Sequence, residues 1–195
     1  MQTVNETKSL LFEPIRIKNL HLKNRLVRSA THEGLADRQG FPTEKLFKLY
    51  GRLARGGVGL IITGFAYVAE DGIGYMPGMN GIHTDPHIAA YRKLVAHVHE
   101  GGARIAMQIA HAGRQTTPAA IGAQPMAPSP VKDASTFVKP RAMSAGDIEQ
   151  VIEAFAQGAR RVQQSGFDAV QLHAAHGYLL SSFLCPHTNR RSDQW

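Results

Sequence analysis

The stretch PHIAAYRKLVAHVHEGGARIAMQIAH, residues 86–111, decides the fold. Residues 86–100 have a helical pattern, two glycines follow the last turn, and residues 103–111 form an apolar run of strand length. Asp85 precedes a proline at the first helical position, so we expect it to cap this helix. A helix that ends at glycine and leads directly into a strand is one unit of an α/β fold.

The same order of helix, glycine and strand occurs twice more. A shorter and less apolar segment before the first helix also fits a strand. The order β-α-β-α-β-α-β predicts parallel strands that are buried on both faces. The additional predicted helices are 43–55 and 146–165, and the additional predicted strands are 25–31, 58–68 and 167–176.

Two local signals add detail to this arrangement. Ser144 and Asp147 have the spacing of a capping box at the start of the third helix. The alternating apolar residues of 15–24, around Lys18 and Asn19, predict a short β-hairpin before the first strand.

The α/β pattern fits either an open doubly wound sheet or a closed barrel. No G-x-G-x-x-G motif follows the first strand, so the dinucleotide-binding sheet lacks its main support. A parallel (β/α)8 TIM barrel needs about 250 residues and eight units. We therefore predict that residues 1–195 are a single domain that supplies about the first four β/α units of such a barrel. Half a barrel leaves two open parallel edges, so we expect that the chain is either a fragment or pairs with something.

Composition and charge limit the function classes. The 195 residues are 43% hydrophobic and 19% charged, as in globular proteins. The longest uncharged, mostly apolar run is the twelve residues 58–69, whereas a membrane span needs about 20. Because the polar N-terminus lacks the apolar stretch of a signal peptide, we expect a cytoplasmic protein with no membrane partner. The net charge of +7 lies mostly in residues 1–55 without a basic run, so we expect no nucleic-acid partner.

Residues 113–143 interrupt the regular spacing. They show neither a helical nor a strand period and hold five of the ten prolines. Because they follow the third strand, they would form a long loop on the barrel face where active sites are built. A lid and a mobile surface insertion are both open interpretations of this loop.

Polar residues at the ends of parallel strands should converge on one site. This set is poor in carboxylates and lacks lysine, which disfavours paired-carboxylate hydrolysis and Schiff-base chemistry. The candidate residues are Ser29, Ala30, Thr31 and His32, then Gly64 and Phe65, then Gln108, and finally His173, His176 and Tyr178.

The most informative local pattern is His173-Ala-Ala-His176-Gly-Tyr178, and it has three interpretations. The histidines could bind a metal with His111 or His187 as third ligand, as in a metal-dependent hydrolase. They could instead satisfy buried backbone groups. The third possibility is a pair of donors that hold an anion or a carbonyl oxygen, with Tyr178 as proton donor.

Taken together, several segments of the sequence resemble the Old Yellow Enzyme family of FMN-dependent NAD(P)H oxidoreductases. The resemblance runs over nearly the whole chain, and the segments occur in the same order as in the family. PHTNRRSDQW at 186–195 also looks like the start of a family segment that continues with a flavin-binding arginine. The segments that carry the resemblance are LFEPIRIKNLHLKNRLVRSAT (11–31), GGVGLIITGFAYV (56–68), MQIAHAGR (107–114) and GFDAVQLHAAHGYLLSSFL (166–184).

The resemblance implies a function: NADH or NADPH reduces FMN, and FMN reduces a small α,β-unsaturated carbonyl compound. His173 and His176 would grip the carbonyl or nitro oxygen, and Tyr178 would protonate the alkene carbon. It implies no resident metal and leaves a homo-oligomer possible. A non-catalytic half-barrel remains an alternative. The residues implied to contact the flavin are Ser29, Ala30, Thr31, His32, Gly64, Phe65 and Gln108.

The sequence departs from the family at several points. His32 stands where threonine or cysteine is common, at a position that tunes the flavin. Cys185, the single cysteine, stands where serine is common, and we expect it to be a small buried residue. His111 and Arg114 are expected to anchor the loop that follows them.

Overall fold

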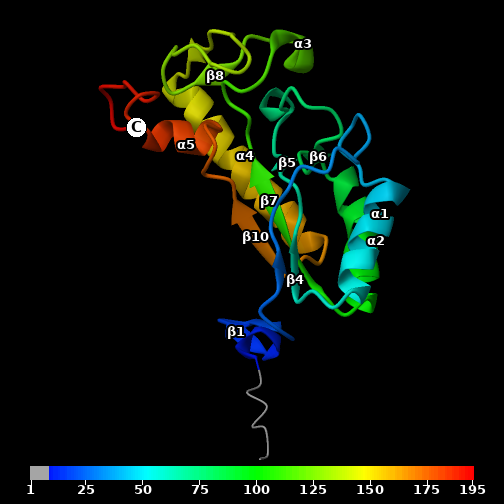
Figure 1. Ribbon diagram of the computed structural model, residues 1–195. Coiled ribbons are helices and arrows are strands. Elements are labelled where there is room, and N and C mark those ends of the chain that lie inside the picture. Colours follow the sequence, from blue (N-terminus) through cyan, green and yellow to red (C-terminus); the bar gives the residue numbers. More distant parts are fainter. Residues whose placement is uncertain (1–8) are drawn as a thin grey trace, which may run out of the picture.

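In the computed structural model, which describes residues 9–195, four parallel strands follow one another in sequence order (Figure 1). β3 (Val27–Arg28) pairs with β4 (Leu60–Ile62), β4 with β7 (Arg104–Ala110), and β7 with β10 (Ala169–Leu172). A doubly wound sheet would reverse this order at a switch point, whereas a barrel keeps it. The predicted half of a (β/α)8 barrel is therefore confirmed.

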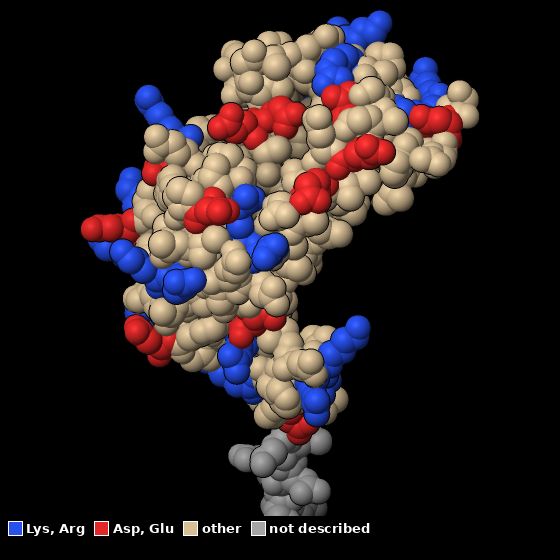
Figure 2. Space-filling model, turned by 180° about the vertical axis from the view of Figure 1, so that it is seen from behind, with Lys and Arg blue, Asp and Glu red and all other residues tan. Residues whose placement is uncertain are grey.

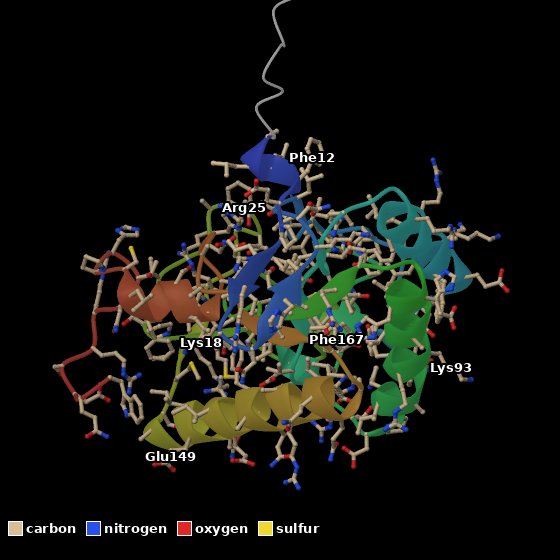
Figure 3. The ribbon with its side chains drawn as sticks, turned by 90° about the horizontal axis from the view of Figure 1, so that it is seen from below. Phe12, Lys18, Arg25, Lys93, Glu149 and Phe167 are labelled. Atoms are coloured by element: carbon tan, nitrogen blue, oxygen red, sulfur yellow. The ribbon has the colours of Figure 1, made fainter. Side chains whose placement is uncertain are left out.

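Three helices cover the outer face of these strands, and Figure 3 shows α2 and α4 on the outer side of the strands, seen from below. They are α1 (Glu44–Arg55), α2 (Pro86–Glu100) and α4 (Ala145–Gln164), each within one residue of its predicted start and end. Alternate strand residues face the helices, so Ile105 and Met107 of β7 lie in the main hydrophobic core.

The other strand residues face the barrel interior. Leu60 and Ala106 form a small separate cluster with Leu22, which comes from the hairpin below the strands. That hairpin, β1 (Ile15–Ile17) and β2 (Leu20–Leu22), confirms the prediction and turns through Lys18 at a φ of 51°. It lies across the lower end of the barrel (Figure 3).

The helix caps confirm one prediction and correct another. The Ser144 hydroxyl accepts from the Asp147 amide at 3.1 Å, and the Ser144 amide donates to the Asp147 carboxylate at 2.7 Å, which completes the predicted capping box. Asp85 makes no capping hydrogen bond, because its backbone is already helical. Its carboxylate instead accepts from Arg161 of α4 at 2.7 Å.

The predicted strand 58–68 is two strands. β4 ends at Ile62, and β5 (Ala66–Tyr67) starts after a break at residues 63–65 and pairs with both β7 and β6 (Asn80–Gly81). The break occurs where the second strand passes close to the end of the first. A Cβ on Gly64 would lie 2.6 Å from the Thr31 carbonyl oxygen, so only glycine fits there.

The segment 113–143 lies beyond the C-terminal ends of the strands (Figure 1). It contains three short elements that its sequence did not predict: α3 (Pro118–Ile121), β8 (Met126–Ala127) and β9 (Arg141–Ala142). The Arg190 amide donates to the Ser129 hydroxyl at 2.8 Å, which ties this segment to the C-terminal residues. The remaining elements are α5 (Leu179–Leu184) and the 3-10 turns η1 (Leu10–Phe12) and η2 (Glu70–Gly72).

Both edges of the half-barrel expose apolar side chains. Val27 on β3 is 47% exposed, and Val170 and Leu172 on β10 are 44% and 56% exposed. Within residues 9–195, neither strand has a neighbour on its outer edge. These are the edges at which a complete barrel would continue.

Over the face seen in Figure 2, Lys and Arg side chains lie interspersed with Asp and Glu. Among the helices of the described residues, none is both long enough and apolar enough to cross a membrane. The polar residues 1–8, which entered the expectation about a signal peptide, lie outside the described part.

Ser144→Ala should lower the free energy of unfolding by about 1 kcal/mol, because the α4 amide loses its capping oxygen. Urea unfolding followed by circular dichroism measures this change. Ser192, which is exposed and makes no side-chain hydrogen bond to the described residues, supplies the control Ser192→Ala. Equal stability of the two variants would contradict the capping assignment.

Candidate active site

A cavity of about 700 Å³ opens at the C-terminal ends of the parallel strands. Eight of the ten predicted site residues line it, and Thr31 and Gly64 do not. Its wall carries amide, imidazole, hydroxyl and apolar groups and no carboxylate. The lining residues are Ser29, Ala30, His32, Phe65, Gln108, Gln171, Leu172, His173, Ala174, Ala175, His176 and Tyr178.

Phe65 is the centre of an aromatic cluster on this wall. Its ring centroid lies 5.5 Å from that of His32, 5.7 Å from His173 and 5.2 Å from Tyr178. The ring of His32 is held from the other side, because its Nε2 lies 3.1 Å from the Pro77 carbonyl oxygen. These contacts bring together side chains from three different strand ends.

His173 is buried and has a defined tautomer. Its backbone amide donates to the Ile109 carbonyl of β7 at 2.9 Å, which extends the strand pairing by one residue. Its Nδ1 accepts from the Ala175 amide at 3.3 Å, so the proton of the neutral ring lies on Nε2. Burial lowers the pKa of His173 below its ordinary value of 6.5, and the nearby His176 lowers it further. The ring is therefore a neutral donor at neutral pH.

Tyr178 lies against His173, with ring centroids 4.8 Å apart. Burial raises the pKa of its phenol above the ordinary value of 10.0, and the nearby Tyr75 adds to this. The hydroxyl therefore keeps its proton at neutral pH and can donate it to a group in the cavity.

His176 has an exposed side chain, and its ring stands edge-on to His173 at 5.2 Å. Its φ of 56° lies in the left-handed region, which is uncommon for a residue with a Cβ. Such backbone is found where the surrounding structure holds it in place, often in active sites.

Gln171 was not predicted from the sequence. In the register of β7 and β10 it stands opposite Gln108, and the Gln108 amide donates to the Gln171 side-chain oxygen at 2.7 Å. The sequence could have indicated this residue, because side chains alternate along strand 169–172 and place Ala169 and Gln171 on the inner face of the barrel.

Gly64 and Thr31 do not line the cavity. The Gly64 amide donates to a Glu33 carboxylate oxygen at 3.2 Å, and the Thr31 hydroxyl donates to the Ser29 carbonyl at 3.2 Å. The same Glu33 oxygen accepts from Arg28 at 2.7 Å and from the Tyr50 hydroxyl at 2.6 Å. The largely buried contacts of Glu33 fix the loop 29–33, whose residues Ser29, Ala30 and His32 line the cavity. Flavin contacts of Gly64 and Thr31 stay predictions.

His111 has both ring nitrogens occupied. Nδ1 accepts from the Gly113 amide at 3.1 Å, and Nε2 lies 3.2 Å from the Asp71 carboxylate. Within residues 9–195, no group of three or more His, Cys, Asp and Glu side chains could hold a metal ion. Among these residues, the His173 and His176 pair has no third ligand of the kind that a catalytic zinc site uses.

Cys185 is exposed, which corrects the expectation of a buried residue. The thiol follows the last turn of α5, where the chain leaves the helix and faces solvent.

Comparison with known proteins identifies the fold family. Residues 10–195 match the NADH:flavin oxidoreductase / NADH oxidase family. The chain belongs to this family. A flavin cofactor and NADH are named in the family description, and NADPH dehydrogenases are among the relatives, so the predicted FMN and NAD(P)H are confirmed.

The individual relatives are longer than this chain. It is 40% identical to an NADH oxidase of Thermoanaerobacter brockii over 95% of the chain and 29% of that protein. It is 37% identical to an NADPH dehydrogenase of Geobacillus sp. strain WCH70, over 96% of the chain and 54% of that protein.

Solved structures give the same result. The Old Yellow Enzyme homologue from Zymomonas mobilis superposes with a TM-score of 0.87 at 32% identity, over 95% of this chain and 54% of that one. Morphinone reductase gives 0.85 at 31% identity, over 94% and 53%. The chain thus spans about half the length of these relatives, and the resemblance to Old Yellow Enzymes is confirmed.

The imidazole of His173 should titrate below pH 6.5 and carry its neutral-form proton on Nε2. Nitrogen-15 NMR of the ring measures both. Because the folded pKa is lowered, the unfolded chain binds the proton first, and the free energy of unfolding should fall as pH drops through 6.5. A midpoint above 6.5, or an Nδ1 proton, would contradict this assignment.

Glu33→Gln should lower the free energy of unfolding by about 3 kcal/mol, because it leaves the largely buried Arg28 without its anion. Asp193→Asn is the matched control, since Asp193 pairs with Arg191 but is 44% exposed. Urea unfolding of both variants measures the two losses in the free energy of unfolding. A similarly small loss in both would show that the contacts of Glu33 are dispensable for stability.

Proposed function

We propose that this chain provides the substrate-reducing half of an FMN-dependent NAD(P)H oxidoreductase that reduces the C=C bond of α,β-unsaturated carbonyl compounds. The observation that carries the proposal is the grouping of His173, His176 and Tyr178. On the wall of one cavity, the ring centroid of His173 lies 5.2 Å from that of His176 and 4.8 Å from that of Tyr178. Because the chain spans between 29% and 54% of the length of these relatives, the activity is proposed for the complete protein.

The residues of the cavity fit a flavin ring. The ring of FMN is flat and aromatic and has amide-like groups along one edge, which match the Gln108 amide and the Phe65 side chain on this wall. The wall also carries no carboxylate to repel the negative charge of a reduced flavin. Ser29, Ala30, His32, Phe65 and Gln108 would hold the ring, whereas barrel phosphate sites are usually built from later strands.

Bound FMN supplies the hydride, and the chain's own residues supply orientation and a proton. The Nε2–H of His173 and the ring of His176 would donate to the substrate carbonyl oxygen. These two donors would stabilise the enolate charge that develops when hydride reaches the β-carbon. Tyr178, which keeps its proton at neutral pH, would then protonate the α-carbon from the same cavity.

Tyr178→Phe should slow alkene reduction by about 100-fold or more, because the α-carbon loses its proton donor. Reduction of the flavin by NAD(P)H should continue, because that step needs no proton from Tyr178. Stopped-flow absorbance of the complete, FMN-loaded enzyme separates the two half-reactions.

Tyr75→Phe is the control for this variant, since Tyr75 is half exposed and does not line the cavity, and loss of its hydroxyl removes only the smaller of the two causes that raise the pKa of Tyr178. Unchanged alkene turnover in Tyr178→Phe would remove Tyr178 from the acid role. Equal slowing of both half-reactions would instead indicate a general loss of flavin binding.

A further inference from the structure

The position of the His176 ring is set by its backbone. The side chain is exposed, and the ring makes no hydrogen bond to residues 9–195, so little besides the main chain holds it beside His173. That main chain has two consecutive left-handed residues, His176 at a φ of 56° and Gly177 at 81°. A left-handed residue with a Cβ is unfavourable by itself, so other contacts have to maintain it.

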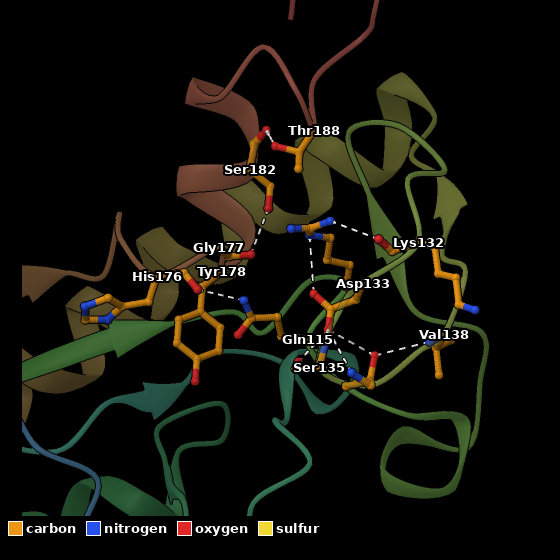
Figure 4. Close-up of polar contacts among 12 residues, drawn as sticks. Gln115, Lys132, Asp133, Ser135, Val138, His176, Gly177, Tyr178, Ser182 and Thr188 are labelled. Atoms are coloured by element: carbon orange, nitrogen blue, oxygen red, sulfur yellow. Dashed lines mark hydrogen bonds and ion pairs between the residues drawn. The ribbon is translucent and has the colours of Figure 1, made fainter.

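Most of those contacts come from the start of α5. The Ser181 hydroxyl donates to the Ala175 carbonyl at 3.1 Å, and the Ser182 hydroxyl donates to the Gly177 carbonyl at 2.9 Å. The carbonyl of His176 is different, because its partner comes from another strand end. It accepts from Nε2 of Gln115 at 2.6 Å, as Figure 4 shows.

We propose that Gln115 is a positioning residue that holds His176 in its left-handed conformation and so keeps the imidazole on the cavity wall. This inference rests on the proposed function for its role in the reaction. Gln115 touches the backbone of His176 and does not line the cavity, so it would act through His176.

The surroundings are built for this contact. A Cβ on Gly177 would lie 2.4 Å from Nε2 of Gln115, so glycine is needed at 177 to admit the amide as well as to adopt its φ. The Leu179 amide donates to the His111 carbonyl at 3.0 Å, which holds α5 against the strand end that carries Gln115. The backbone amide of Gln115 donates to the Ala112 carbonyl at 3.0 Å and closes a turn there.

The loop that carries Gln115 is also fixed at a second point. Arg114 donates to the Lys132 carbonyl at 3.3 Å, and its Nε lies 3.6 Å from the Asp133 carboxylate. Asp133 is buried and accepts from the backbone amides of Ser135 and Thr136, each at 2.9 Å. Figure 4 shows this group beside Gln115. Residues 113–143 therefore present the Gln115 amide to His176 in a fixed place.

The test compares Gln115→Ala and Gln115→Glu in the 195-residue chain by NMR. The glutamate has nearly the size of glutamine, but its carboxylate cannot donate to the His176 carbonyl at neutral pH. Loss of one such hydrogen bond shifts a local equilibrium by about fivefold. The backbone shifts of His176, which report φ, should move away from left-handed values in both variants.

The titration of His173 gives a second readout, and a control variant distinguishes it from a general loss of burial, which would also raise the midpoint. His176 and Tyr178 are the titratable groups against its ring, and the charge of His176 contributes to the lowered pKa of His173. When the His176 ring leaves its place, the titration midpoint of His173 should rise. Gln124→Ala is the control, because Gln124 lies on the same loop and donates to the Lys139 carbonyl at 3.2 Å away from the cavity.

Unchanged His176 shifts and an unchanged His173 midpoint in both Gln115 variants would overturn the inference. The same would follow if Gln124→Ala produced equal changes. Neither measurement involves FMN, NAD(P)H or an alkene, so failure of the proposed function would leave these results as they are, and failure of this inference would leave the Tyr178 experiment unaffected.

Discussion

The parallel pairing of β7 with β10 is the constraint on which the rest of the site depends. The register from Ala106 opposite Ala169 to Ile109 opposite Leu172 sets which residues of the fourth strand face inward. It places Gln171 against Gln108, and the His173 amide donates to the Ile109 carbonyl directly beyond the last pair. A slip of one residue would turn every side chain of β10 to the opposite face. The contacts of His173 with Phe65 and Tyr178 follow from this register, and the Ala175 amide then sets its tautomer.

The strand ends supply the chemistry, and the loops behind them supply the rigidity. Glu33 joins the ends of the first two strands, since it accepts from Arg28, Tyr50 and the Gly64 amide. Residues 113–143 are pinned to the C-terminal segment and reach the fourth strand end through Gln115. The cavity wall is thus fixed from two sides, as preorganised donors require.

The sequence predicts those features that local rules determine. Helix boundaries follow from glycine stops and from the Ser144 capping box, and the site residues follow from the rule that parallel strands end at a common edge. Features that depend on contacts between distant residues were not predictable. The Asp85 carboxylate pairs with Arg161, 76 residues away, in place of capping its own helix. The break in strand 58–68 reflects the approach of Glu33 to Gly64, and Gln115 reaches His176 across 61 residues. No local pattern encodes such pairings.

The central claim is that the cavity at the strand ends binds the flavin ring. Titration of the 195-residue chain with FMN, followed by two-dimensional NMR, tests it most directly because weak binding is also visible. The account predicts shift changes confined to the cavity wall, at Ser29, Phe65, Gln108 and His173, and their loss when Gln108 is replaced by a bulky residue. Changes confined to another part of the surface, or none at saturating FMN, would contradict it.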